Sequence, residues 1–227
     1  MVNNSKNAFW QALLAALVVF LLGITIGFLF ELSRNTQVAD TLYLSETSLL
    51  DQQLQTQVIN SASTSCEVAK ENLFSLADSV YVDAALLEKY DSVSKFQNTL
   101  NILHRRYDLL RLMIWSEGVE LKARCHQPFH TVVYVYSYGT NNIEIKAQES
   151  TVSKMLSDMK EIHGSDLLLL PIAGNLNLSS VNAFLKYYNV TQLPAIIIDQ
   201  NKTLFPPFTS QGLEQAVFQR NTENLNN

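Results

Sequence analysis

An uncharged run near the N-terminus constrains this chain more than any other feature. It extends from Phe9 to Phe30 and reads FWQALLAALVVFLLGITIGFLF. A helix needs about 20 apolar residues to cross a bilayer core, so the run is long enough to span it. A cleavable signal peptide is the competing interpretation, but its apolar region has roughly 7–15 residues and ends at a small-residue cleavage site. The length of the run, and its exit into Glu-Leu-Ser-Arg, favour an uncleaved anchor over residues 9–30.

The charges beside this run predict its orientation. Lys6 and the α-amine precede it, whereas Glu31 offsets Arg34 after it. Because positively charged flanks stay on the cytoplasmic side, we expect residues 1–8 to be cytoplasmic. The rest of the chain would then lie outside the cytoplasm, in a single-pass protein of the cell membrane.

Two kinds of partner follow from this segment. Membrane lipid is the expected partner of residues 9–30. Gly23 and Gly27 form a GxxxG pattern, which lets two membrane helices approach closely. A homodimer through these glycines stays open, as does an interpretation without a dimer, because glycine is common in membrane helices.

Composition and motifs exclude several classes of function. The net charge is -5, so there is no basic footprint for a nucleic-acid partner. Hydrophobic residues make up 47% of the chain and charged residues 16%, which agrees with a membrane segment. The sequence has no phosphate-binding glycine loop, no His-Glu-x-x-His motif and only two cysteines, so we expect neither a cofactor nor a metal.

Helical patterns fill the region after the anchor. Residues 31–65 predict a polar helical stalk, and residues 66–125 predict an antiparallel helical hairpin. Each hairpin helix has apolar residues at spacings of three and four. The first stripe is Cys66, Ala69, Leu73, Leu76, Val80, Ala84 and Leu87; the second is Val93, Phe96, Leu100, Leu103, Tyr107, Leu110 and Ile114. Arg105, Arg106 and Arg111 fall mostly on the opposite face, where we expect solvent, with a contact to lipid headgroups as the alternative.

From residue 126 to 220 the pattern predicts an α/β domain, followed by a disordered tail at 221–227. Val- and Tyr-rich residues 130–136 predict a strand, and the apolar run at 166–172 predicts a central parallel strand. The remaining expected elements are helices at 142–162, 179–188 and 210–220, a strand within 189–199, and a strand at 202–205 after a turn at Gln200-Asn201. The order β-α-β-α-β-β-α indicates a mixed sheet with flanking helices.

The passage Tyr188-Asn-Val-Thr-Gln-Leu-Pro-Ala-Ile-Ile-Ile198 resembles the segment before the third strand of the thioredoxin-like family. The resemblance covers roughly residues 129–220 and implies that Pro194 is cis and faces the loop after the first strand, with Leu193 and Ala195 around it. Ala195 stands where the family usually has threonine. The anchor, the hairpin and the domain together look like a group of membrane-anchored proteins from small-genome archaea.

In those proteins the loop often reads Cys-x-x-Cys-x-x-Gln. Here Asn142 and Ile145 stand at the cysteine positions, and Gln148 is retained. Thiol–disulfide exchange needs two thiols, so this loop predicts a protein without that enzymatic activity. The resemblance implies a surface that holds an extended peptide by backbone hydrogen bonds. Its expected residues are Gly139, Asn141, Asn142, Ile145, Leu193, Pro194 and Ala195; whether it still binds or only packs stays open.

Cys66 and Cys125 lie elsewhere. An even cysteine count in an exported domain predicts a disulfide between them, and two unpaired buried thiols are the alternative. The pairing predicts that the second hairpin helix ends near Gly118, so that the chain can turn back. Cys125, His126 and His130 could offer three metal ligands, but the spacing matches no known zinc set.

Three hypotheses of function result. The first is a non-redox, thioredoxin-like ectodomain that binds a protein or peptide or is a subunit of a membrane assembly. The second is a thiol–disulfide oxidoreductase that uses Cys66 and Cys125. The third is a structural homodimer built through the membrane helix and the stalk. Sequons at Asn177, Asn189 and Asn201 are glycosylation candidates and give weak support to an external domain.

Overall fold

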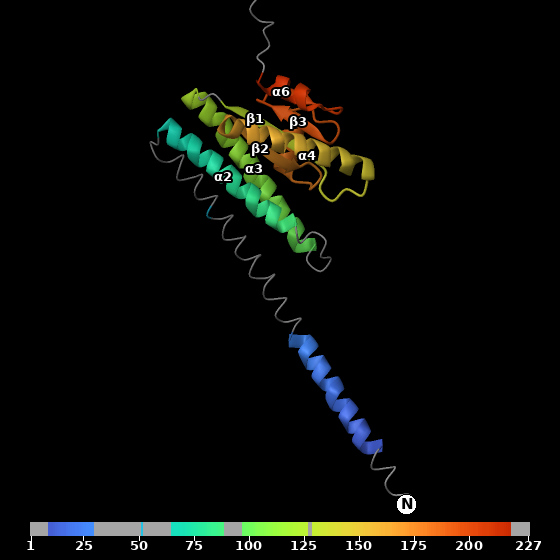
Figure 1. Cartoon of the computed structure of the whole chain (residues 1–227). Coiled ribbons are helices and arrows are strands. Elements are labelled where there is room, and N and C mark those ends of the chain that lie inside the picture. The colour runs from blue at the N-terminus through green and yellow to red at the C-terminus, as the bar shows by residue number, and fades with distance from the viewer. Residues whose placement is uncertain (1–8, 30–50, 52–64, 89–96, 127–128, 219–227) are drawn as a thin grey trace, which may run out of the picture. The chain divides into compact units, whose positions relative to one another are not determined.

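The computed structural model describes residues 9–29, 51, 65–88, 97–126 and 129–218 (Figure 1). Most of the predicted stalk and the predicted tail fall outside these residues. The chain divides into two compact units, Met1–Ser48 and Leu49–Asn227, which we describe separately. In the first unit the described residues form the helix Phe9–Leu29, with a mean hydropathy of 2.8. Its length and composition suit a membrane span, as predicted, and Thr25 donates its hydroxyl hydrogen to the carbonyls of Leu21 and Leu22.

The second unit begins with the predicted helical hairpin. Helix α2 spans Cys66–Glu88 and α3 spans Gln97–Cys125, and the two lie side by side in Figure 1. The predicted stripes are buried from Ala69 to Ala84 in α2 and from Leu100 to Ile114 in α3, and Cys66 is half-buried. The side chain of Leu87, and Val93 and Phe96, lie outside the described part of the chain. The hairpin belongs to the same compact unit as the sheet, because α3 packs on strand β2 and helix α5 and α2 packs on β2.

Two expectations about α3 are wrong. The helix does not end near Gly118 but continues without a break to Cys125. Gly118 instead lets α3 approach β2, since a Cβ atom there would lie 3.0 Å from Leu168 Cδ2. Arg111 is not solvated: it is 5% exposed, because that face of α3 is covered, whereas Arg105 and Arg106 are exposed as predicted.

Four strands form a mixed sheet in the order β2-β1-β3-β4. They are β1 (His130–Tyr136), β2 (Leu167–Ala173), β3 (Ala195–Ile198) and β4 (Lys202–Leu204). Strand β1 is parallel to β2 and antiparallel to β3, and β3 is antiparallel to β4. The prediction that β2 is central is therefore wrong; it is an edge strand. Its apolar run is explained by the helices α2, α3 and α4, which pack against it.

Helices cover both faces of the sheet, which confirms the mixed α/β class. The remaining helices are α4 (Ile143–His163), η2 (Gly164–Asp166), α5 (Ser179–Tyr187) and α6 (Ser210–Phe218). One core joins the sheet to α4 and α6 through residues such as Val132, Leu156 and Leu213. The other joins it to α5 and α3 through residues such as Val133, Phe184 and Trp115.

Candidate functional site

The loop after β1 is built around two backbone requirements. Gly139 has a φ of +67°, a value that favours glycine. Asn142 is the N-cap of α4, and its side-chain oxygen accepts hydrogen bonds from the backbone N–H groups of Glu144, at 2.9 Å, and Ile145, at 3.3 Å. Asn142 therefore has a structural role at the position where the resembling family has a cysteine.

The peptide bond between Leu193 and Pro194 is cis, as predicted. Val135 pairs with Ala195, so the antiparallel register places Pro194 next to Tyr136, at the end of β1 that leads into the loop. Pro194 and Ala195 are buried, and Leu193 is half-buried against Val135 and Gly174.

The predicted surface is thus split by burial. Gly139, Asn141 and Asn142 are exposed, and Ile145 is half-buried. The side chain of Asn175 bonds to both backbone groups of Tyr138, which ties this loop to the loop after β2.

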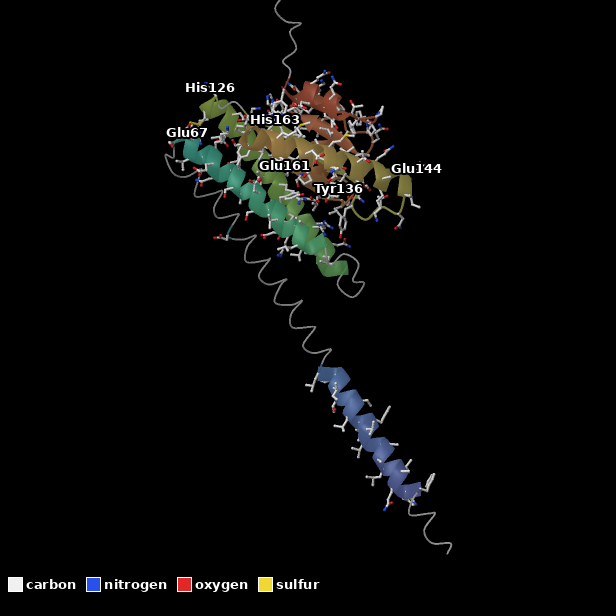
Figure 2. All side chains as sticks on the ribbon, in the orientation of Figure 1. Glu67, His126, Tyr136, Glu144, Glu161 and His163 are labelled. Carbon is white, nitrogen blue, oxygen red and sulfur yellow. A yellow bond between two sulfur atoms is a disulfide. The ribbon has the colours of Figure 1, made fainter. Side chains whose placement is uncertain are left out.

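The open space lies on the other side of the loop, toward the hairpin. A cavity of about 590 Å³ is lined by Leu100, Asn101, Tyr136, Ser137, Tyr138, Gly139, Thr140, Lys146, Glu149 and Leu176. Gly139 is the predicted site residue that takes part in it. Figure 2 shows Tyr136 between α4 and the α2–α3 hairpin.

Two further cavities continue this space along β2. One of about 370 Å³ is lined by Tyr81, Ala85, Arg111, Tyr134, Tyr136, Lys146, Glu149, Ser150, Ser153 and Pro171. The next, of about 110 Å³, is lined by Ala77, Asp78, Tyr81, Tyr134, Ser153, Leu156, Ser157, Lys160, Leu169 and Pro171. Adjacent cavities share wall residues along β1 and α4. The hairpin wall is formed by α3 at the first cavity, by α2 with Arg111 of α3 at the second and by α2 at the third, and we call the three together the α2–α4 groove.

The floor of this groove is the outer edge of β2. Lys160 Nζ donates to the carbonyl of Leu167 at 2.9 Å, so the backbone polar groups of Leu167 face away from β1. Because backbone direction alternates along a strand, those of Leu169 and Pro171 face outward too. Pro171 has no N–H to lose there, which is why proline is tolerated at a sheet edge. Leu169 keeps an outward N–H and C=O at the groove floor.

A buried ion pair stands behind the middle of the groove. Arg111 Nη1 lies 3.3 Å from Asp108 Oδ1, and Asp108 is 1% exposed. Burial raises the pKa of Asp108 to about 6, although the charge of Arg111 and the backbone N–H of Ala173 oppose this shift. Among the described residues, Asp108 Oδ2 has no hydrogen-bond partner. The carboxylate is therefore incompletely satisfied.

The groove wall holds further perturbed groups. Burial raises the pKa of Glu149, although its carboxylate accepts the N–H of Ser137. Burial also raises the pKa of Tyr134, with the charge of Glu149 as a second cause, while the Tyr134 hydroxyl donates to the carbonyl of Glu149. At the far end, burial lowers the pKa of Lys160 despite Asp78 nearby. These shifts follow from a groove that is partly withdrawn from water.

The disulfide lies at the opposite end of the sheet. Cys66 and Cys125 are joined, as predicted, with Cα atoms 5.6 Å apart. One helical turn before Cys125, Lys122 Nζ contacts Asp199 Oδ1 at 2.7 Å, and Asp199 also binds His130 at the start of β1. Strand β1 spans about 20 Å, so the disulfide is remote from the loop at its other end.

The remaining predicted sites are the possible metal ligands and the glycosylation candidates. Cys125 is bonded to Cys66 and so cannot act with His126 and His130 as a metal ligand. In the part of the chain that the structure describes, no group of three or more His, Cys, Asp or Glu residues is arranged to hold a metal. Asn177, Asn189 and Asn201 are all exposed, and the first two have positive φ, which asparagine tolerates better than most residues.

Comparison with known proteins leaves the site to be interpreted from its geometry: no family model matches the chain, and no curated protein matches it.

The sequence did not predict Arg111, Tyr136 and Glu149 as residues of the site. A signal for Arg111 was available, because His104, Asp108, Arg111 and Trp115 recur at helical spacing beside the apolar stripe of α3. An acid and a base at that spacing on a nearly covered face predict a buried pair.

Proposed function

We propose that this chain is a membrane-anchored, non-redox module of thioredoxin-like fold that binds an extended protein segment in the α2–α4 groove. The anchor is Phe9–Leu29, and the binding part is the second unit, outside the cytoplasm. The family assignment is supported by the strand order, by the antiparallel third strand and by the cis proline before it.

One observation carries the binding proposal: the floor of the groove is the outer edge of strand β2, where Leu169 lines the cavity and its backbone groups are directed away from β1. An extended segment binds such an edge by main-chain hydrogen bonds and needs no thiol. Tyrosine and serine side chains on the walls offer apolar contact and hydrogen bonds to the side chains of that segment, since Tyr81, Ser150 and Ser153 are exposed.

Two alternatives have weaker support. An oxidoreductase using Cys66 and Cys125 would place its chemistry about 20 Å from the loop that the resemblance identifies, at the other end of β1. A homodimer through Gly23 and Gly27 is compatible with the helix, because a Cβ atom at either glycine meets nothing within 4 Å in the described chain. That observation permits a close helix contact and does not require one.

The proposal is tested with full-length protein in lipid nanodiscs and a synthetic library of heptapeptides with free C-termini. Selected peptides should bind the wild type and lose roughly ten-fold or more in affinity with Ser153→Trp, which fills two of the three cavities. Lys154→Trp is the matched control, since its side chain is 79% exposed on the same helix and lines neither cavity. No selected peptide, or equal binding by Ser153→Trp, would contradict a peptide site in this groove.

A further inference from the structure

Arg111 is the least explained side chain of the groove. It projects from α3 into the cavity of about 370 Å³, with 6% of its side chain exposed. A guanidinium group has five N–H donors in a planar fork. In the described part of the chain, its hydrogen bond is the one to Asp108, at 3.3 Å and through a single nitrogen. Its other N–H donors have no hydrogen-bond partner among the described residues, and its side chain lines the cavity.

Arg111 keeps donors that Asp108 does not use, and among the described residues none of its nitrogens is a fully buried atom without a partner, so these donors stay accessible to a small ligand. Asp108 compensates Arg111 poorly: the contact uses one carboxylate oxygen, and the other oxygen is left without a hydrogen bond among the described residues. A planar anion inside the cavity would satisfy the outer edge of the fork through two parallel hydrogen bonds.

The charges of the residues that line the cavity determine which class of anion fits it. Lys146 adds a second positive charge, but Glu149 lies on the same wall and would repel a dianion such as phosphate. Ser150 and Ser153 offer neutral hydrogen-bond donors to an anion with a single negative charge. A carboxylate is planar and carries one negative charge, so it fits this combination of groups.

The position of Arg111 along β2 fits the end of a bound segment. The backbone N–H of Ala173, at the end of β2, interacts with the carboxylate of Asp108, which contacts Arg111. Pro171, two residues earlier in β2, lines the same cavity as Arg111. A segment that pairs with the outward backbone groups of Leu169 and runs parallel to β2 would bring its C-terminal end to Arg111.

We propose that Arg111 binds a carboxylate of the protein segment that occupies the α2–α4 groove. This inference rests on the proposed function and specifies the ligand's chemistry. The carboxylate is the C-terminus of the segment, and an acidic side chain in its place is an outcome that the test detects.

The first measurement uses wild-type full-length protein in nanodiscs with ¹⁵N-labelled arginine, so that no variant needs to fold. Sodium propionate should shift the Arg111 side-chain N–H resonance saturably, and neutral propionamide should not. The exposed Arg105, Arg106 and Arg124 are internal controls and should not saturate. Absence of a saturable shift at Arg111 would overturn the inference.

The second measurement compares acetyl-Thr-Val-Thr-Val with a free C-terminus, its C-terminal amide, and an amide that ends in Glu. Because the C-terminus is the source, the free acid should bind roughly ten-fold more tightly than the amide. A Glu-terminated amide with the affinity of the free acid would overturn this source and point to an acidic side chain instead. Arg111→Lys keeps the charge but loses the fork, so it should remove the preference.

The outcomes distinguish the two proposals. If peptides bind in a Ser153→Trp-sensitive way but acid and amide forms bind equally, the carboxylate inference is wrong and the proposed function stands. If propionate shifts Arg111 but no peptide binds, the groove takes a small carboxylate. The peptide-binding function is then wrong, and so is this inference in the form stated.

Discussion

Asp108 shows how one residue links the packing of α3 to the chemistry of the groove. Its carboxyl group is almost fully buried, and burial raises its pKa to about 6 against the opposing charge of Arg111. At neutral pH this carboxyl group is mostly ionised, and its ionisation lowers the stability of the folded state. The reason is that the folded state binds the proton more tightly than the unfolded state does. The ion pair is therefore better explained as a device that holds Arg111 in place than as a source of stability.

We predict a pH-dependent effect of Asp108→Asn on folding. The folded pKa of Asp108, about 6, exceeds its model value of 3.8, so the carboxyl group favours folding below pH 4 and loses this contribution as the pH rises to 6. The wild type should therefore lose about 2 kcal/mol relative to Asp108→Asn between pH 4.5 and 7.5. Urea unfolding, followed by Trp115 fluorescence in a Trp10→Phe background, measures this difference.

Asp199 is the control, because its shift has the opposite sign. Burial acts to raise the pKa of Asp199, but hydrogen bonds from Lys122, the Thr131 N–H and His130 outweigh burial and lower it. Its contribution is thus lost as the pH falls, so Asp199→Asn should be less harmful in acid than at neutral pH. A difference between wild type and Asp108→Asn that is equal at pH 4.5 and 7.5 would contradict the buried-carboxylate account.

At the scale of elements, the length of α3 determines how the hairpin is closed. Because α3 runs unbroken to Cys125, its last turn lies beside the first turn of α2, which starts at Cys66. The disulfide therefore joins two helix ends directly and closes a loop across 59 positions. Lys122 and Asp199 then fasten the same end of the hairpin to the sheet.

We predict that Cys66→Ser with Cys125→Ser lowers the free energy of unfolding by about 4 kcal/mol, because the unfolded chain regains the entropy of the open loop. Urea unfolding of the two proteins measures the loss, and mass mapping without reductant should find the linked peptides in the wild type. Wild type treated with reductant should match the variant. Free thiols in the oxidised wild type, or equal stability of the two proteins, would refute the structural role of the bond.

At the scale of the whole molecule, the apolar helix of the first unit is the feature that bears on membrane attachment. The helix Phe9–Leu29 meets the requirements of a membrane span by length and composition. Its orientation rests on few charges, with Lys6 before the helix and Glu31 against Arg34 after it.

We predict that residues 31–227 lie outside the cytoplasm and that the N-terminus lies inside. Protease added to intact cells should remove a C-terminal tag, whereas an N-terminal tag should be cleaved only after the membrane is permeabilised. The reverse pattern would show the opposite orientation. An intact mass that begins after residue 30 would instead show that the apolar run is a cleaved signal peptide.

Local patterns in the sequence determined the elements of this protein. The uncharged run predicted an apolar helix long enough to cross a bilayer, and the helix Phe9–Leu29 confirms that length and hydropathy. The Val- and Tyr-rich composition of residues 130–136 predicted β1. Spacings of three and four residues predicted α2 and α4 closely, because a helix places such a repeating set of side chains on one face. The resemblance of the segment around Pro194 to the thioredoxin-like family implied its cis bond, and the count of cysteines predicted their pairing.

Only the tertiary structure decided which of these elements meet. Gly118 reads as a helix end until Leu168, fifty positions later, is found against it. The sequence predicts that Arg111 is solvated. In the structure it lines a cavity together with Tyr81 of α2, Tyr136 of β1 and Glu149 of α4. The apolar run of β2 reads as a central strand, yet it is an edge strand under helices. Periodicity reports that a side chain is buried but not by which segment, since burial depends on contacts between residues far apart in the chain.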